Sequence, residues 1–323
     1  MNSSRLGSFP YVTVVIATAG RPQLLRSALA ALATQDVGTA AFEVVVSVDG
    51  PDPSTVQVLE EAAAGSLRLR WVQQSRRSGP AAARNAALEL ASGEIVAITD
   101  DDCVPSPHWL AGLAEVFNEH SEVGVVIGKT VTNRDCLTPF SHYVENTDGK
   151  THQTCNIGYR RTVIEALKGF DERFPYSHED TDLFLRAERI TQTRFAPGAL
   201  VLHPPRELSV REFVRSARRF EGDFIFAEKH PRLYRKRHDG KGPLAAVFWD
   251  VVLKHSGKQL VVNAPWLVQS PVTYLRFAGA QLLYSASLLL QLPRYWRRYC
   301  WRGLAPTAPR SVAGPPLNGG RGE

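Results

Sequence analysis

The chain has 323 residues, a formal net charge of +6 and 44% hydrophobic residues. That length fits one large domain, or one domain with an appendage, and the apolar share is sufficient to build a core. The modest positive charge favours anionic partners, such as a phosphorylated ligand or an acidic membrane face. No Cys-x-x-Cys or Cys/His ligand spacing occurs, which argues against a zinc site and predicts reduced thiols at Cys103, Cys136, Cys155 and Cys300.

The first 130 residues alternate between strand-like and helix-like patterns. Residues 11–18 are rich in Val and Ile and lead directly into a helical pattern without a cleavage-like site, which favours a strand over a signal peptide. Strands are predicted at 11–18, 42–50, 67–74, 93–102 and 123–130, and helices at 21–35, 55–64, 79–92 and 107–120. Repeated strand–helix–strand units predict an α/β fold with a mostly parallel sheet flanked by helices.

After residue 130 the alternation weakens. A short strand and a helix are predicted within 154–167, a turn around Gly169, a helix at 178–190 and a last strand ending at His203. The chain then becomes helical and basic, with eleven Lys or Arg against six Asp or Glu between Arg206 and Lys241. The segment 304–323 is rich in Pro, Gly and Arg, a composition typical of a disordered tail.

Three of the predicted strands end in polar residues: Thr18, Asp49 and the triplet Asp100-Asp101-Asp102. In such sheets ligands bind beyond the carboxyl ends of the strands, so these side chains should meet at one rim. Strand alternation would point Asp100 and Asp102 the same way. Two converging carboxylates suit Mg²⁺ or Mn²⁺, whereas the alternative is a solvated cap on the helix that follows.

A second acidic cluster, His178-Glu179-Asp180, lies about eighty residues further on. It fits the acidic first turn of a helix, and it also fits the general base that a transfer reaction needs for its acceptor. His203, at the end of the last strand, is compatible with a metal ligand or a phosphate contact, although a lone histidine is usually neither.

Five segments resemble successive blocks of the family 2 glycosyltransferases, which have the GT-A fold: 12–35, 42–50, 79–105, 156–174 and 178–189. They occur in order between about Tyr11 and His203. The resemblance implies an inverting enzyme that takes a sugar from a UDP-, GDP- or dTDP-linked donor with Mg²⁺ or Mn²⁺ as cofactor.

The resemblance also implies roles for individual residues. Asp100, Asp101 and Asp102 match the DxD motif that holds ribose and the cation, with Asp100, Asp102 and His203 as metal ligands. Asp180, preceded by Glu179, matches the catalytic base. The remaining nucleotide contacts would be Thr18 and Arg21 in the first loop, Asp49 at the nucleobase and Arg84 near the diphosphate. The chain departs from the family in having "ATAGR" for the frequent "PTYNR" and "LKGFDE" for "GGFDE".

These assignments divide the chain into a catalytic domain at 1–205, a basic and apolar helical region at 206–303 and the tail at 304–323. Within the catalytic domain, about 1–130 would hold the nucleotide sugar and about 131–205 the acceptor. The helical region contains a charge-free run of 17 residues from Phe277 to Pro293, which is short for a membrane span.

The arginines and tryptophans that follow this run favour an interfacial position at the inner, cytoplasmic face of the cell membrane. That position would suit a cell-envelope glycan or a lipid-linked acceptor. A solvated helix face, a packed accessory helix and an oligomer contact are the alternatives. No recognition motif supports nucleic-acid binding.

Two other functions compete with glycosyl transfer. A sugar nucleotidyltransferase shares the α/β architecture and acidic metal ligands, but "ATAGRP" only faintly resembles its phosphate loop. A non-catalytic sugar-nucleotide or glycan-binding protein on the same fold would not need both Asp102 and Asp180.

Overall fold

The computed structural model describes residues 10–300, so the predicted tail at 304–323 lies outside the described residues. One sheet of eight strands has the order β3-β2-β1-β4-β8-β6-β9-β5. Its strands are β1 (Val12–Thr18), β2 (Phe42–Val48), β3 (Leu69–Gln73), β4 (Ile95–Asp100), β5 (Val104–Pro105), β6 (Val123–Val131), β8 (Ile157–Arg160) and β9 (Gln192–Leu202). Within this sheet only β8 and β5 pair antiparallel with their neighbours, which confirms the mostly parallel sheet.

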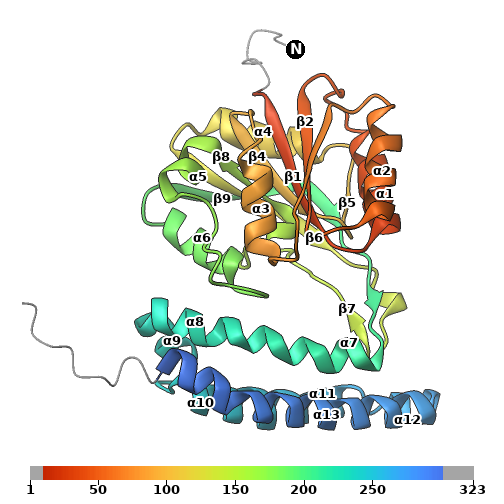
Figure 1. Ribbon diagram of the computed structural model, residues 1–323, viewed down its shortest axis with the longest axis vertical. Helices are drawn as coiled ribbons and strands as arrows, with labels where there is room; N and C mark the ends of the chain where they lie inside the picture. Colours follow the sequence, from red (N-terminus) through yellow and green to blue (C-terminus); the bar gives the residue numbers. More distant parts are fainter. Residues whose placement is uncertain (1–9, 301–323) are drawn as a thin grey trace, which may run out of the picture.

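Helices cover both faces of the sheet (Figure 1). One face packs against α1 (Pro22–Leu32), α2 (Pro53–Ala63) and α4 (Trp109–Glu119), and the other against α3 (Pro80–Leu88), α5 (Arg161–Leu167) and α6 (Glu179–Ala187). Alternation along β1 explains the two cores, because Val14 and Ile16 face the first group of helices and Val15 faces the second. The strands are apolar on both faces for this reason.

The chain from residue 206 forms a helical layer under the carboxyl ends of the strands (Figure 1). The long stretch α7 (Val210–Arg215), η3 (Ser216–Phe220) and α8 (Glu221–Lys229) lies next to the sheet domain. The other helical segments are α9 (Pro231–Arg237), α10 (Pro243–Ala246), η4 (Val247–His255), α11 (Ser256–Val262), α12 (Trp266–Gln269), α13 (Pro271–Tyr295) and η5 (Trp296–Cys300). Whether 206–303 is a separate domain stays a prediction.

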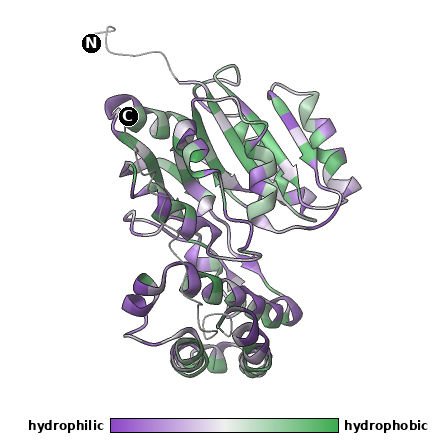
Figure 2. Cartoon of the chain, turned by 60° about the vertical axis from the view of Figure 1, so that its left-hand side comes forward, coloured by the Kyte–Doolittle hydropathy of each residue, from purple (hydrophilic) through white to green (hydrophobic). Residues whose placement is uncertain are grey.

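The outermost helices carry many apolar residues (Figure 2). Even so, within residues 10–300 no helix combines the length and the apolar character that a membrane span requires. A small antiparallel pair, β7 (Ser141–His142) with β10 (Arg206–Glu207), joins the helical layer to the sheet domain. This pair was not predicted, and it positions His142 and Arg206 near the strand ends.

Candidate active site

A cleft of about 430 Å³ opens at the carboxyl ends of β1, β2 and β4. It brings together nine of the ten predicted site residues: Thr18, Arg21, Asp49, Arg84, Asp100, Asp102, Glu179, Asp180 and His203. The expectation that the polar strand ends meet at one rim is therefore correct. The remaining predicted residue, Asp101, does not line the cleft.

The acidic triplet is arranged around two arginines rather than by strand alternation. β4 ends at Asp100, and Asp101 and Asp102 form a turn, so the alternation argument does not apply to them. Arg21 donates from Nε to Asp101 at 3.0 Å and from Nη1 to Asp102 at 2.8 Å. Asp100 instead accepts a hydrogen bond of 2.9 Å from Arg84. Two protein cations thus offset much of the repulsion between the three carboxylates.

Asp101 lies below the floor of the cleft. It is fully buried, and Thr18 Oγ1 donates a hydrogen bond of 2.5 Å to its carboxylate. Burial raises the pKa of Asp101 to about 7, although Arg21 and Thr18 act in the opposite direction. In this structure Asp101 positions Thr18 and Arg21, and its direct contact with a nucleotide stays a prediction.

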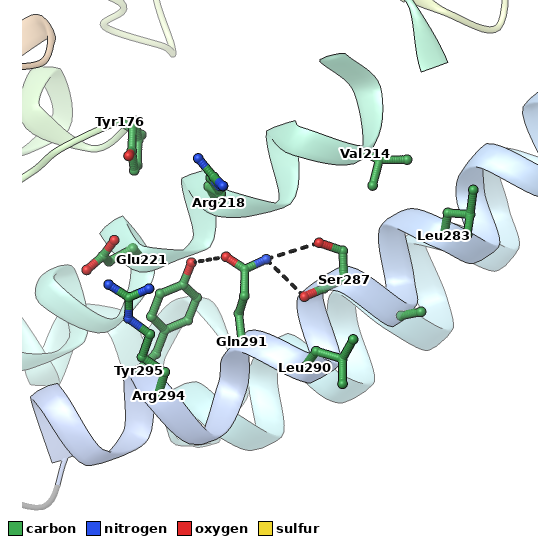
Figure 3. Close-up of a pocket in the computed structure, with 11 residues that line it drawn as sticks. Tyr176, Val214, Arg218, Glu221, Leu283, Ser287, Leu290, Gln291, Arg294 and Tyr295 are labelled. Carbon is green, nitrogen blue, oxygen red and sulfur yellow. Dashed lines mark hydrogen bonds between the residues drawn. The ribbon is translucent and has the colours of Figure 1, made fainter. Parts of the chain in front are cut away.

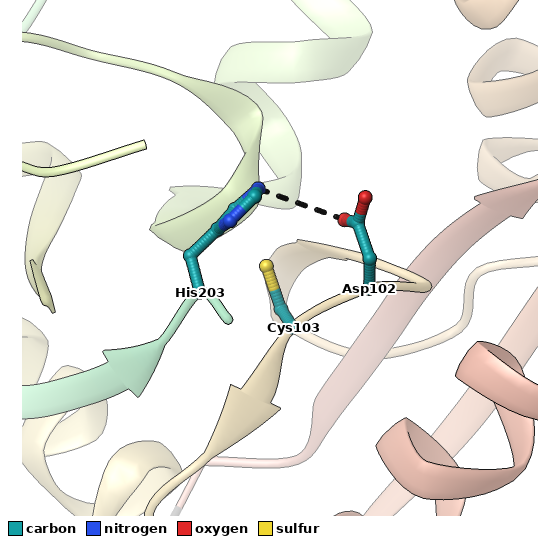
Figure 4. A group of neighbouring side chains, drawn as sticks. All are labelled: Asp102, Cys103 and His203. Atoms are coloured by element: carbon teal, nitrogen blue, oxygen red, sulfur yellow. Dashed lines mark ion pairs between the residues drawn. The ribbon is translucent and has the colours of Figure 1, made fainter. Parts of the chain in front are cut away.

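Among residues 10–300, the group of side chains suited to a divalent cation contains Asp102 and His203. His203 Nε2 lies 3.7 Å from Asp102 Oδ1, and both side chains are buried or nearly so (Figure 4). A carboxylate oxygen and an imidazole nitrogen fit Mn²⁺ well and Mg²⁺ less well. Asp100, the third predicted ligand, lines the same cleft but is paired with Arg84.

Cys103 lies beside this pair, and no pattern in the sequence pointed to this position (Figure 4). The ligand atoms of Asp102, Cys103 and His203 all lie within 4.8 Å of one another. A hydrogen bond with Cys155, together with burial, raises the pKa of the Cys103 thiol well above its usual range. The sulfur therefore stays protonated near neutral pH, and it is a poor ligand for a hard cation.

Arg84 connects the two acidic clusters. Its guanidinium donates to Asp100 at 2.9 Å and to Glu179 at 2.8 Å, and the side chain is buried. Burial, and then the charge of Asp180, raise the pKa of Glu179. Removing one partner of such a buried network typically costs about 3–5 kcal/mol. Because its terminal nitrogens are engaged, the predicted contact of Arg84 with a diphosphate stays a prediction.

Glu179 and Asp180 are neighbours in different environments at the start of α6. Glu179 is buried against Arg84, whereas Asp180 is partly exposed and lines the cleft. The Asp180 carboxylate accepts hydrogen bonds from the Thr181 amide at 2.6 Å and the Thr181 hydroxyl at 3.3 Å. These bonds fix its orientation, so Asp180 is the better placed of the two to accept a proton from a bound molecule.

Asp49 holds the loop that precedes α3. Its carboxylate accepts hydrogen bonds from the amides of Ser78 at 2.6 Å and Gly79 at 3.1 Å. Gly79 has a φ of +95°, and a Cβ there would lie 2.7 Å from the carbonyl oxygen of Pro175. Only glycine fits this position, so the loop that contains Gly79 can pack closely against the loop that contains Pro175.

Sequence reasoning missed the basic side of the cleft, formed by His142, Arg206 and Arg219. The Nε of Arg206 is buried without a hydrogen-bond partner, and no carboxylate among residues 10–300 lies within ion-pair distance of Arg219. Burial, and then the charge of Arg219, lower the pKa of His142 to about 4. The excess of Lys and Arg after residue 205 was a signal, but it could not single out these positions.

Known proteins resemble this chain in sequence and in structure. The family model "Glycosyl transferase family 2" matches residues 13–170. Glycosyltransferase AglE of Haloferax volcanii is 28% identical over 172 residues, which cover 50% of this chain and 57% of that protein. TarS of Staphylococcus aureus, a poly(ribitol-phosphate) β-N-acetylglucosaminyltransferase, is 32% identical over 172 residues, covering 50% and 29%. The chain thus spans little more than half of the first relative and less of the second.

Among solved structures, the mannosyltransferase PcManGT of Pyrobaculum calidifontis, in complex with GDP-Man and Mn²⁺, superposes with a TM-score of 0.57. The superposition covers 87% of this chain and 86% of PcManGT at 21% identity. The structures of PcManGT and of TarS residues 1–349 confirm the predicted GT-A fold. The family-model match over residues 13–170 bears out the predicted resemblance of this segment to the family 2 glycosyltransferases.

Proposed function

We propose that the chain is an inverting glycosyltransferase that moves a sugar from a nucleoside-diphosphate sugar to a hydroxyl acceptor. One observation carries this proposal: the partly exposed Asp180 carboxylate opens into the same cleft as the Asp102–His203 pair. A general base for the acceptor hydroxyl and a cation site for the leaving diphosphate thus line the same cleft. The match of residues 13–170 to the family model supports the same reaction.

The reaction is a single displacement at the anomeric carbon. Asp180 accepts the proton of the acceptor hydroxyl, whose oxygen forms a new bond to that carbon from the face opposite the diphosphate. The bond between the anomeric carbon and the β-phosphate oxygen breaks, and the nucleoside diphosphate leaves with the bonding electron pair. Attack from the opposite face inverts the anomeric configuration.

Asp102 and His203 would hold Mg²⁺ or Mn²⁺, and Asp100 completes the acidic rim. When bound there, the cation neutralises charge that develops on the leaving diphosphate. Arg206 and Arg219 add positive charge from the other side of the cleft, and the unpartnered Nε of Arg206 is a ready donor to a phosphate oxygen. PcManGT was solved with GDP-Man and Mn²⁺, which supports a cation in this role.

The nucleoside would lie along Thr18, Arg21 and Asp49, at the ends of β1 and β2. TarS residues 1–349 were solved with UDP-GlcNAc, and that structure superposes on this chain with a TM-score of 0.56 at 20% identity, covering 89% of this chain and 91% of that one. This neighbour supports a nucleoside-diphosphate sugar as the donor, and we propose a UDP, GDP or dTDP sugar.

We further propose that the helical region rests on the inner face of the cell membrane and presents the cleft to a cell-envelope glycan or a lipid-linked acceptor. Large apolar side chains are exposed along α11, α12 and α13, among them Val261, Val268 and Leu290. Contiguous exposed apolar surface of this kind marks contact with a membrane or a partner.

The test starts with the donor. Each of a panel of UDP, GDP and dTDP sugars is added with Mn²⁺, and stabilisation of the folded protein is followed by thermal unfolding. The sugar that stabilises the protein is then incubated with candidate acceptors. Release of free nucleoside diphosphate with an inverted product linkage by NMR is expected. In a parallel incubation, release of pyrophosphate from a nucleoside triphosphate and a sugar 1-phosphate would identify a nucleotidyltransferase instead. Binding without any turnover would identify a binding protein.

A further inference from the structure

A second cavity of about 720 Å³ lies outside the catalytic cleft, between the α7–η3–α8 stretch and α13 (Figure 3). The first stretch contributes Val214, Arg218 and Glu221. Helix α13 contributes Leu283, Ala286, Ser287, Leu290, Gln291, Arg294 and Tyr295. The proposed reaction assigns no role to this cavity, although it is larger than the cleft.

Tyr176 joins the two spaces, because it lines both the cleft and the second cavity. Ser177 Oγ donates a hydrogen bond of 2.6 Å to the backbone carbonyl of Arg219, which fastens this loop to η3. The adjacent residues Arg218 and Arg219 line different cavities: Arg218 lines the second cavity and Arg219 lines the cleft. A ligand that passes Tyr176 can therefore occupy both.

The second cavity carries uncompensated positive charge. Its only carboxylate, Glu221, already accepts from Arg298 at 2.9 Å and from the Tyr299 hydroxyl at 2.8 Å. Arg218 and Arg294 have no carboxylate within ion-pair distance in the described part of the chain, residues 10–300. Two such guanidinium groups at one cavity suit a phosphate, which can accept several of their hydrogen bonds.

The rest of the cavity wall offers little to a polar ligand. Tyr295 donates to Gln291 at 2.6 Å, and the Gln291 amide donates to Ser287, so these polar groups already have partners (Figure 3). On the open side, Leu290 is 81% exposed and Leu283 is 57% exposed. An aliphatic chain would cover these leucines and remove apolar surface from water.

We propose that the second cavity binds the phosphate and the first part of the aliphatic chain of a lipid-linked saccharide, which is the acceptor. The phosphate lies between Arg218 and Arg294, the chain lies on Leu283 and Leu290, and the saccharide passes Tyr176 so that its hydroxyl reaches Asp180. This proposal rests on the proposed function and selects the lipid-linked acceptor over a free glycan. The displacement at the anomeric carbon is unchanged.

Farnesyl phosphate is the probe, because it carries a phosphate and a short isoprenoid chain without the saccharide. Its binding to the full chain is measured by isothermal titration calorimetry, below the concentration at which it forms micelles. Farnesol and inorganic phosphate each supply only half of the proposed contacts. Both should bind at least about tenfold more weakly, since each loses contacts worth about 1.4 kcal/mol or more.

The variant pair Arg218→Ala, Arg294→Ala should lower the affinity for farnesyl phosphate by at least about tenfold. The matched control is Arg215→Ala, Arg297→Ala, which removes two exposed arginines outside the cavity, one from α7 and one from η5 directly after α13. This control should bind farnesyl phosphate like the unmodified chain. Equal losses in both pairs would mean general surface attraction, and an unchanged affinity in the first pair would also overturn the proposal.

Binding of UDP, GDP and dTDP with Mn²⁺ separates this inference from the proposed function. At least one nucleotide should bind equally well to the unmodified chain and to both variant pairs, which also shows that the variants are folded. Loss of farnesyl phosphate binding with the nucleotide retained is the expected result for Arg218→Ala, Arg294→Ala. If no nucleotide binds while farnesyl phosphate does, the donor site is wrong and the lipid site stands.

Discussion

The sheet domain, residues 10–205, and the helical region, residues 206–300, differ in how far they bury their apolar side chains. The strands β1, β2 and β4 are almost completely buried between two layers of helices. Among the described residues, thirteen of the seventeen exposed large apolar side chains lie between Phe248 and Leu290. The first region covers its own apolar surface, whereas the second leaves a surface for something else to cover.

The two arginines that hold the acidic rim differ in their partners from three arginines of the helical region. Arg21 and Arg84 of the sheet domain are paired with Asp100, Asp101, Asp102 and Glu179, and they hold the acidic rim in place. Arg218, Arg219 and Arg294 of the helical region have no carboxylate within ion-pair distance in residues 10–300. The first set holds the acidic rim in place, whereas the second set keeps its charge available for anionic ligands.

The strongest test of this division is Asp180→Asn, because the chemistry should depend on the sheet domain. We expect kcat to fall by about 10²–10⁴-fold, the usual contribution of a general base. Donor affinity, measured by calorimetry with Mn²⁺, should change little because the base acts on the acceptor. A loss of donor affinity as large as the loss of rate would identify Asp180 as a donor ligand.

Asp102→Asn should lower metal-dependent turnover by about 10²–10³-fold, through weaker stabilisation of charge on the leaving group. The fold should survive, since Asp102 contacts Arg21 and His203 at the rim rather than the apolar core. Turnover is measured as a function of Mn²⁺ concentration, and circular dichroism monitors folding. Unchanged turnover would remove Asp102 from the metal site.

The contrast in burial predicts different costs for the same substitution. Leu113→Ala removes a side chain that is 1% exposed in the sheet domain, so the free energy of unfolding should fall by about 2–5 kcal/mol. Leu290→Ala removes one that is 81% exposed, and the change should stay below about 0.5 kcal/mol. Urea unfolding in the absence of lipid compares the two. Similar costs would mean that Leu290 is covered in solution.

A histidine of the sheet domain that lies near Arg237 of the helical region predicts a pH effect. The His152 ring stacks on Phe184 with centroids 4.0 Å apart, and burial, then the charge of Arg237, lower the pKa of His152 to about 4. The unfolded chain binds this proton near pH 6.5, so the stability is fully present above about pH 6.5 and is lost as pH falls toward 4.

At pH 5 this loss amounts to about 2 kcal/mol in the free energy of unfolding. His152→Gln should remove that part of the difference between urea unfolding at pH 7.5 and at pH 5. An unaltered pH dependence in His152→Gln would show that the imidazole titrates normally.

The smallest expected effect concerns membrane contact. The triple variant Val261→Ser, Val268→Ser, Leu275→Ser removes exposed apolar groups from α11, α12 and α13. Its binding to anionic liposomes in a flotation assay should weaken by about tenfold, and Ile190→Ser, which changes an exposed residue of the sheet domain, should bind like the unmodified chain. Equal binding by the triple variant and the unmodified chain would argue against the membrane position.

The sequence by itself predicted most of the sheet domain. Runs such as Val12–Thr18 and Phe42–Val48 are strands as expected, because β-branched residues buried on both faces leave a clear local pattern. The last strand was expected to end at His203 and ends at Leu202. The rim of the cleft was also predictable, since parallel strands bring their carboxyl ends together whatever the details of packing.

The pairing of the polar groups could not be predicted, because it depends on how distant segments pack together. Asp101 is buried under the cleft, and Arg84 bridges Asp100, 16 residues along the chain, to Glu179, 95 residues along the chain. Cys103 meets His203 because β5 pairs with β9. The second cavity likewise depends on α13 packing against η3 and α8. Local patterns report which side chains a strand or helix buries, but contacts between distant segments depend on packing that no local pattern encodes.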